Sequence, residues 1–146
     1  MSLDQHQAFL TATKVPMRLS IAHGEKPIIV ALWFTYEAGK LWCACHQNSY
    51  LVRQLRSLIG DTDAAHPCAF DISTNEIPYR GVAGSGTVSL HADLGADKLR
   101  GLTTRYLEQA DSPFAQWLLS RADDEVALCI TPDTVRHWDF TERMSD

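Results

Sequence analysis

The chain has 146 residues, of which 45% are hydrophobic and 21% charged, a balance that excludes disordered and fibrous proteins. Its 13 Lys and Arg residues against 18 Asp and Glu give a formal net charge of -5 without any basic run, so we expect no nucleic-acid partner. No apolar stretch approaches the roughly 18–20 residues of a membrane helix, and the N-terminal segment is too polar for a secretory signal. We therefore expect a single cytoplasmic domain over residues 1–146, without a membrane partner.

The four cysteines, Cys43, Cys45, Cys68 and Cys129, lie inside apolar runs, which predicts reduced and buried thiols. Cys43 and Cys45 followed by His46 are ligand types that zinc prefers. However, alternation along a strand places the two cysteines on one face and His46 on the other, so the three side chains do not converge on one ion. We predict no metal site.

The first half of the chain is rich in strands joined by tight turns. Residues 4–14 are predicted to form a short helix, and the alternation that begins at Met17 predicts a half-buried strand over residues 17–21. Residues 28–36 form a nearly continuous apolar run, which predicts one central strand covered on both faces. A turn over residues 38–40 leads into a strand over residues 41–46, so these strands favour an antiparallel sheet.

The second half combines helices with further strands. Apolar residues at helical spacing after Ser49 predict a helix that ends at Gly60. Gly84 and Gly86 at strand positions predict a bulge, or the close approach of another backbone or a flat ligand. The remaining predicted elements are strands over residues 68–73 and 82–90, helices over 96–109 and 112–121, and a strand over 125–138 interrupted at Pro132.

This order of elements predicts the fold class. Strands in short hairpins, rather than in strict alternation with helices, argue against a doubly wound parallel sheet. Gly84-Ser85-Gly86 lies mid-strand, so it is neither a nucleophile elbow nor a dinucleotide-binding loop. Six antiparallel strands are best closed as a barrel, because closure removes exposed edges. We therefore expect a mainly β (α+β) fold, a six-stranded antiparallel β-barrel with peripheral helices.

The predicted helix start at Ser49 is a candidate anion site. Free N–H groups and the helix dipole favour an anion such as a phosphate there. Ser49 can donate its hydroxyl, and Arg53 lies one turn further on. The alternative is that Ser49 only caps the helix and that Arg53 is solvated.

Several segments occur in an order that is typical of one family. They are PIIVALWF (27–34), EAGKLW (37–42), CHQNS (45–49) leading into Leu55-Arg56, PYRGV (78–82), GSGTV (84–88) and WDF (138–140). Together they resemble the pyridoxamine 5'-phosphate oxidase-like FMN-binding split barrels, over about residues 16–140. The resemblance implies a Greek-key split β-barrel that works as a homodimer, with the cofactor in the groove between the subunits.

The resemblance also implies a function, that of an FMN-dependent oxidoreductase acting on a small molecule. The flavin carries the electron chemistry in such a protein, so we name no catalytic residue. The flat ring needs an apolar slot, which tryptophans such as Trp42 can line, although a tryptophan in a small barrel can equally belong to the core. The implied cofactor-binding residues are Trp33, Ala44, Cys45, His46, Ser49, Arg53 and Arg80, with Trp138 as a contact from the partner subunit.

One position departs from the family. A Lys or Arg usually follows two residues after the serine, where this chain has Leu51, and Tyr50 replaces another frequently basic residue. Losing a charge-assisted contact to the phosphate costs on the order of 1.5–3 kcal/mol. Arg53, Arg80 or Arg18 takes over this role, or the ligand differs. The alternatives are a deazaflavin carrier, a non-catalytic binding protein for flavin, haem or another flat metabolite, and a cofactor-free dimeric barrel.

Overall fold

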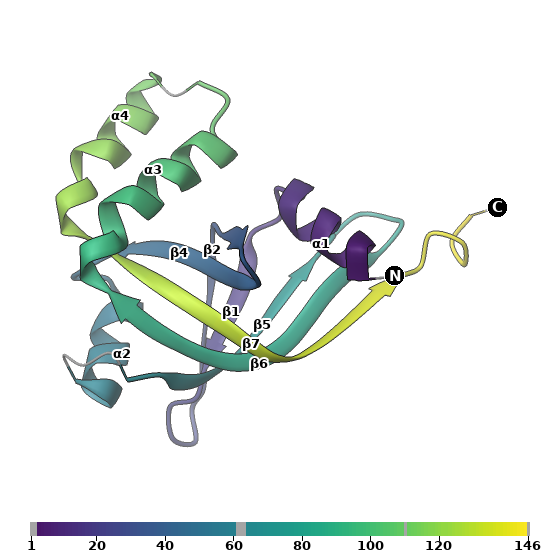
Figure 1. Ribbon diagram of the computed structural model, residues 1–146, viewed down its shortest axis with the longest axis horizontal. Helices are drawn as coiled ribbons and strands as arrows, with labels where there is room; N and C mark the ends of the chain where they lie inside the picture. Colours follow the sequence, from purple (N-terminus) through teal and green to yellow (C-terminus); the bar gives the residue numbers. More distant parts are fainter. Residues whose placement is uncertain (1–2, 61–63, 110, 146) are drawn as a thin grey trace.

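The computed structural model describes residues 3–60, 64–109 and 111–145. Its strands are β1 (Met17–Ile21), β2 (Ile28–Leu32), β3 (Thr35–Glu37), β4 (Lys40–His46), β5 (His66–Ser73), β6 (Arg80–His91) and β7 (Glu125–Asp139). Its helices are α1 (Leu3–Ala12), α2 (Tyr50–Ile59), α3 (Gly95–Tyr106) and α4 (Pro113–Ser120), with 3-10 turns η1 (Ala92–Leu94) and η2 (Ala122–Asp124). The strands form one curled antiparallel sheet in the order β2-β1-β5-β6-β7-β4-β3, with α3 and α4 over one end (Figure 1).

The short link between the two edge strands forces the sheet to curl. β2 and β3 lie at opposite edges of the 7-stranded order, yet only Trp33 and Phe34 separate them in the chain. The three peptide steps from Leu32 to Thr35 span at most about 11 Å, whereas seven strands laid flat span about 29 Å. The two edges therefore approach each other around Phe34, whose side chain is fully buried, and the sheet closes into a split barrel.

This link corrects the prediction of one central strand over residues 28–36, which is wrong. The segment is divided between two edge strands, and the side chains of β2 alternate between half-buried and exposed, with Ile29 70% exposed. An apolar run suits a strand buried on both faces, but here the turn toward the opposite edge interrupts the run at Trp33. The sheet thus has seven strands rather than six, while the predicted class, a mainly β antiparallel split barrel with peripheral helices, is confirmed.

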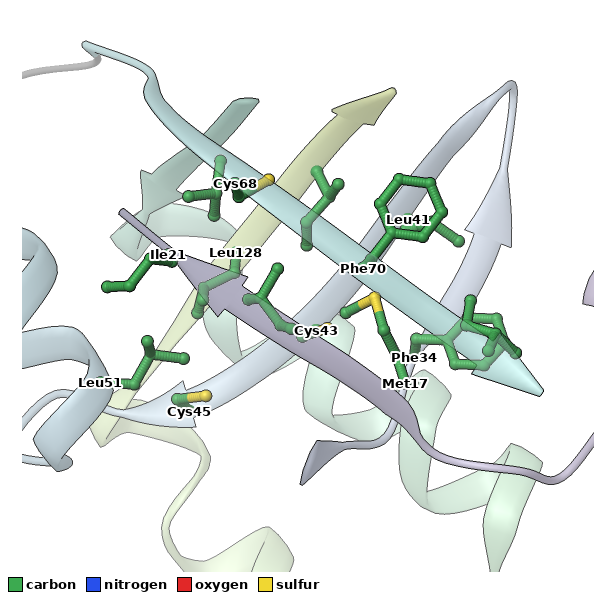
Figure 2. Close-up of a cluster of buried hydrophobic side chains, with 14 of the residues drawn as sticks. Met17, Ile21, Phe34, Leu41, Cys43, Cys45, Leu51, Cys68, Phe70 and Leu128 are labelled. Atoms are coloured by element: carbon green, nitrogen blue, oxygen red, sulfur yellow. The ribbon is translucent and has the colours of Figure 1, made fainter. Parts of the chain in front are cut away.

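The core fills the inside of the barrel. Inward-facing side chains of the strands alternate with outward-facing ones, as in β1, where Met17, Leu19 and Ile21 are fully buried. Helix α2 adds Leu51, Val52 and Leu55 to the same cluster, and α1 adds Phe9 and Leu10. Figure 2 shows Leu51 pointing from α2 toward Ile21 and Cys45, so this helix closes one end of the core.

The cysteines occupy the positions that alternation predicted. All four are free and buried, and Cys43 and Cys45 point into the core while the intervening and following residues of β4 face outward. Burial raises the pKa of the Cys45 thiol to about 12, and that of Cys68 also to about 12. These thiols are therefore protonated, unreactive core side chains.

The glycines of β6 allow two backbones to approach closely. The pairing of β6 with β7 shifts register between Ser85 and Gly86, which leaves Asp133 as an extra residue on β7, next to Pro132. A Cβ atom on Gly86 would lie 2.1 Å from the carbonyl oxygen of Thr131. The predicted bulge and the predicted backbone approach are both confirmed, and the proline lies beside the bulge, where proline is tolerated in a strand.

The helices agree with their predictions to within a few residues. Ser49 caps α2 by accepting a hydrogen bond from the Val52 N–H, and Gly60 ends this helix with a positive φ of 73°. Ser112 caps α4 in the same way through the Ala115 N–H. In the described part of the chain, no helix is long and apolar enough to span a membrane.

The close approach at Gly86 can be tested by adding one methyl group. We expect Gly86→Ala to lower the free energy of unfolding by about 1–3 kcal/mol, because the backbone of Thr131 cannot yield as a side chain would. Gly101→Ala is the matched control, since a Cβ at this exposed position in α3 meets nothing within 4 Å. It should raise stability by roughly 0.5–1 kcal/mol. Urea denaturation measures both changes, and equal effects of the two substitutions would contradict the assignment.

Candidate functional site

A cavity of about 290 Å³ lies between the outer face of the sheet and the two helices α3 and α4. Its walls come from the end of β2, from β4, from the start of β7 and from both helices. They are almost entirely apolar, and we call this space the α3–α4 cavity. It is lined by Ala31, Leu32, Trp33, Ala44, Leu99, Leu102, Phe114, Leu118 and Glu125.

Packing holds Trp33 in a fixed orientation in the lining of this cavity. Its ring stacks on the ring of Tyr106, with centroids 4.9 Å apart and an interplanar angle of 2°. The hydroxyl of Tyr106 in turn accepts a hydrogen bond of 3.3 Å from the Phe34 N–H. The guanidinium of Arg105 lies over both Phe34 and Tyr106 and donates to the carbonyl oxygens of Leu10 and two further residues at the end of α1. The indole is thus a rigid aromatic wall.

Glu125 places a carboxyl group in the apolar lining. It is the first residue of β7, is only 8% exposed, and its Oε2 has no hydrogen-bond partner among the described residues. Burial raises the pKa of this carboxyl above its ordinary value; Arg121 and His46 oppose the shift, and Asp124 adds to it. Helix α3 contributes to the burial because Gly95 packs directly on the Glu125 backbone, where a Cβ would lie 1.8 Å from the carbonyl oxygen.

The start of α2 lies beside the same strand ends. His46 pairs with Glu125 across β4 and β7, and its carbonyl oxygen accepts a hydrogen bond of 2.9 Å from the Ser49 N–H. The Gln47 N–H donates to the carbonyl oxygen of Asp124 at 2.8 Å, which joins the same two segments again. The sequence-predicted residues Trp33 and Ala44 therefore line the cavity, while the pairing of β4 with β7 places His46, and Ser49 bonded to it, next to Glu125.

The side chains of α2 divide between core and solvent. Leu51 is 4% exposed and belongs to the core, whereas Tyr50 is 54% exposed and Arg53 is exposed. Leu51, where the resemblance would place a basic residue, thus points inward, where a charge would be costly. Among the cations of α2, Arg53 lies closest in sequence to Ser49.

Three other predicted residues lie elsewhere. Cys45 faces the core, on the opposite side of β4 from Ala44 and His46. Arg80 and Trp138 are near neighbours at the far end of the β6–β7 ladder, where Arg80 pairs with Asp139 and Trp138 pairs with Gly81. That end of β7 is separated from Glu125 by about 40 Å of extended strand, and Figure 1 shows it at the opposite side of the molecule from α2.

Arg80 has a separate environment. Its guanidinium lies 5.5 Å from the centroid of the Phe9 ring, and the residue borders two surface cavities of about 410 and 520 Å³. Trp138 is half-buried, and a Cβ on Gly81 would lie 2.7 Å from its ring. Within a single chain, neither residue reaches the α3–α4 cavity.

Comparison with solved structures identifies the fold. The conserved hypothetical protein Rv2991 from Mycobacterium tuberculosis is similar over 100% of this chain and 89% of its own, with a TM-score of 0.76 and 16% identity. An F420 reductase is similar over 87% of this chain and 93% of its own, with a TM-score of 0.65 and 18% identity. A putative pyridoxamine 5'-phosphate oxidase from Listeria innocua is similar over 92% and 95%, with a TM-score of 0.64 and 15% identity. The chain has the pyridoxamine 5'-phosphate oxidase-like split-barrel fold.

The resemblance seen in the sequence is therefore confirmed at the level of this split barrel. Neither a protein-family model nor a curated protein matches the sequence. The agreement with the split-barrel structures thus depends on the order and pairing of the strands.

Two residues of the split barrel's cavity region were missed by sequence reasoning. Glu125 stands directly before a run of five buried apolar residues, and an acidic residue that opens such a strand is the signal that could have identified it. Tyr106 lies at the end of α3 and is 73 positions from Trp33 in the chain. No local pattern indicates their stacking, because only the packing of α3 brings the two rings together.

The raised pKa of Glu125 predicts a pH-dependent stability. Below the ordinary Glu pKa of about 4.3, the carboxyl is protonated in both the folded and the unfolded chain. As the pH rises, the unfolded chain ionises first, so the folded state loses stability until the pH exceeds the raised pKa. We expect the free energy of unfolding of the wild type to fall relative to that of Glu125→Gln as the pH rises above about 4. Urea denaturation of both proteins at matched pH measures this difference, and a constant difference would contradict the assignment.

Proposed function

We propose that the protein binds a flavin-type cofactor, FMN or the deazaflavin F420, and acts with it as an oxidoreductase on a small molecule. The observation that carries the proposal is the apolar α3–α4 cavity beside the start of α2. The fold is shared with structures described as an F420 reductase and as a putative pyridoxamine 5'-phosphate oxidase, and this similarity supports the same choice.

The residues present fit the ring of such a cofactor. Trp33 and Ala44 offer flat apolar surface, and the orphaned Oε2 of Glu125 offers a polar contact in an otherwise apolar wall. A volume of about 290 Å³ is smaller than the roughly 300–1,000 Å³ of pockets that hold a whole drug-sized ligand. The cavity therefore suits a ring system, and the phosphate-bearing chain of the cofactor would lie outside it.

The residues at the start of α2 fit a phosphate less completely. The first N–H groups of a helix lack intrahelical acceptors, and the helix dipole adds a partial positive charge there. Ser49 would add its hydroxyl and Arg53 a full charge from the exposed face of the helix. Because Leu51 is buried in the core, the phosphate would be held by fewer charge-assisted contacts than in the family as a whole.

A bound flavin supplies electron and hydride transfer, and the protein supplies orientation and a dry environment. Trp33, braced by Tyr106, would fix the ring, and the apolar side chains of α3 and α4 would exclude water from it. The burial of Leu51 also favours a second candidate, a non-catalytic protein that binds flavin weakly. A reduced nicotinamide separates the two candidates. With the enzyme, it should reduce the bound flavin and bleach the flavin absorbance, whereas with the non-catalytic protein the absorbance should stay unchanged.

The phosphate site can be tested by restoring a cation on the exposed side of α2. We expect Tyr50→Arg to tighten FMN binding about three- to tenfold, or roughly 0.7–1.4 kcal/mol, because the added charge lies beside Ser49. Fluorescence quenching measures the dissociation constant for FMN and for riboflavin, which lacks the phosphate. Only FMN should respond to the substitution.

Ser57→Arg is the matched control, because it adds the same charge to an exposed position near the opposite end of α2. It should leave the affinity for FMN nearly unchanged. Arg53→Ala should weaken the binding of FMN but not of riboflavin. Equal responses of the two ligands would place the phosphate elsewhere, and a colourless protein that quenches neither ligand at micromolar concentration would contradict flavin binding.

We further propose that the protein forms a homodimer through the outer face of β1, β5 and β6. This part of the sheet carries small exposed residues, among them Ala69 and Ser85, which pair with each other across β5 and β6. An outer face of small side chains allows a second sheet to approach closely. A dimer would also allow Trp138 and Arg80 of one subunit to approach the cavity of the other.

Light scattering coupled to gel filtration tests this interface. We expect the wild type to have twice the mass of the 16.3 kDa chain, and Ala69→Arg to shift it to a monomer. Ala92→Arg is the control, because it places the same side chain at an exposed position in η1, outside the proposed face. A monomeric wild type at tens of micromolar would contradict the dimer, and dissociation by both substitutions would contradict the choice of face.

A further inference from the structure

One oxygen of the Glu125 carboxyl, Oε2, is buried in the α3–α4 cavity and has no hydrogen-bond partner among the described residues. The residue is only 8% exposed. Among the described residues that line the α3–α4 cavity, it is the one ionisable side chain. A buried oxygen of this kind is costly to leave unbonded, so we expect a bound group, a ligand or an ordered water, to supply the donor.

The neighbouring polar groups are engaged elsewhere. His46 directs its Nδ1 toward the Asn48 N–H at 3.0 Å, and the guanidinium of Arg121 lies 4.7 Å from the centroid of the Trp117 ring. Asp124 accepts a hydrogen bond of 3.3 Å from the Gln47 side chain. These groups influence the carboxyl through their charges, but none of them is a hydrogen-bond partner of Oε2.

We propose that Glu125 recognises the imide-type edge of a flat heteroaromatic ring, in which an N–H donor lies next to a carbonyl acceptor. This inference rests on the proposed function, because flavins and deazaflavins both carry such an edge at N3. The inference goes beyond that function because it names Glu125 as the residue that determines specificity, and the ring N–H and carbonyl as the atoms to which Glu125 bonds. Haem has no such edge and would not satisfy the carboxyl.

The protonation state of Glu125 determines how many hydrogen bonds it makes with the ring. A neutral carboxyl accepts from the N–H through its carbonyl oxygen and donates its own O–H to the ring carbonyl, giving two parallel bonds. An ionised carboxylate accepts from the N–H only and faces the ring carbonyl with a like partial charge. The ring should therefore bind more tightly at low pH. The other charged or titratable groups around the carboxyl are Arg121, His46 and Asp124.

The test compares riboflavin with 3-methylriboflavin, which lacks the N–H at N3 and is otherwise the same ring. Neither ligand carries a phosphate, so the start of α2 does not contribute. We expect the wild type to prefer riboflavin by about tenfold or more at pH 6, measured by fluorescence quenching. Glu125→Gln should keep a preference, because an amide offers both a donor and an acceptor, but its preference should not change between pH 5 and pH 8. Glu125→Leu should bind the two ligands equally.

Leu118→Ala is the matched control, because it alters the apolar wall of the same cavity. It should lower the affinities for riboflavin and 3-methylriboflavin to the same extent and leave the ratio of the two dissociation constants unchanged. Thermal unfolding of Glu125→Leu verifies that the variant is folded, and we expect it to be at least as stable as the wild type at pH 7 because a buried carboxyl has been removed.

The outcomes separate this inference from the proposed function. If riboflavin and FMN bind but the wild type does not distinguish 3-methylriboflavin, the role of Glu125 is overturned and flavin binding stands. A preference that persists in Glu125→Leu overturns the role of Glu125 in the same way. If the wild type binds neither these flavins nor F420, the proposed function falls and this inference falls with it.

Discussion

The two-residue link between β2 and β3 is the constraint on which the rest of the structure depends. It joins strands that lie at opposite edges of the sheet, so the edges must approach each other and the sheet must close. Phe34 turns inward at this point and is fully buried, while Trp33 turns toward α3 and stacks on Tyr106. The two residues of this link therefore have two roles: Phe34 closes the core, and Trp33 forms the aromatic wall of the α3–α4 cavity.

Helix α3 connects this closure to the rest of the molecule. At its end, Arg105 donates to carbonyl oxygens at the C-terminus of α1, and at its start, Gly95 packs against the backbone of Glu125. The absence of a side chain at Gly95 lets the helix lie directly on the strand. Glu125 itself is buried in a cavity otherwise lined by apolar groups, and its Oε2 has no hydrogen-bond partner among the described residues.

The orientation of α2 determines the character of the neighbouring anion site. Its apolar face carries Leu51, Val52 and Leu55 into the core, so the remaining positions must supply any contact with a phosphate. Because Leu51 helps to close the end of the barrel, a basic residue at this position would remove core packing as well as add charge. Stability and phosphate affinity thus make opposite demands on the same residue.

The amino-acid sequence by itself determined most of the local structure. The alternation in β1 and β4, the capping residues Ser49 and Gly60, and the bulge implied by Gly86 all follow from local sterics and hydrogen bonding, and the structure contains each of them. The order of these elements was also enough to indicate the split barrel. Only the tertiary structure decided that residues 28–36 divide between two sheet edges, because an apolar run has the same appearance in a central strand and in two edge strands that pack on a common core. Packing over long sequence separations likewise brought Trp33 to Tyr106 and enclosed Glu125, and the length of the β6–β7 ladder separated Trp138 and Arg80 from Glu125.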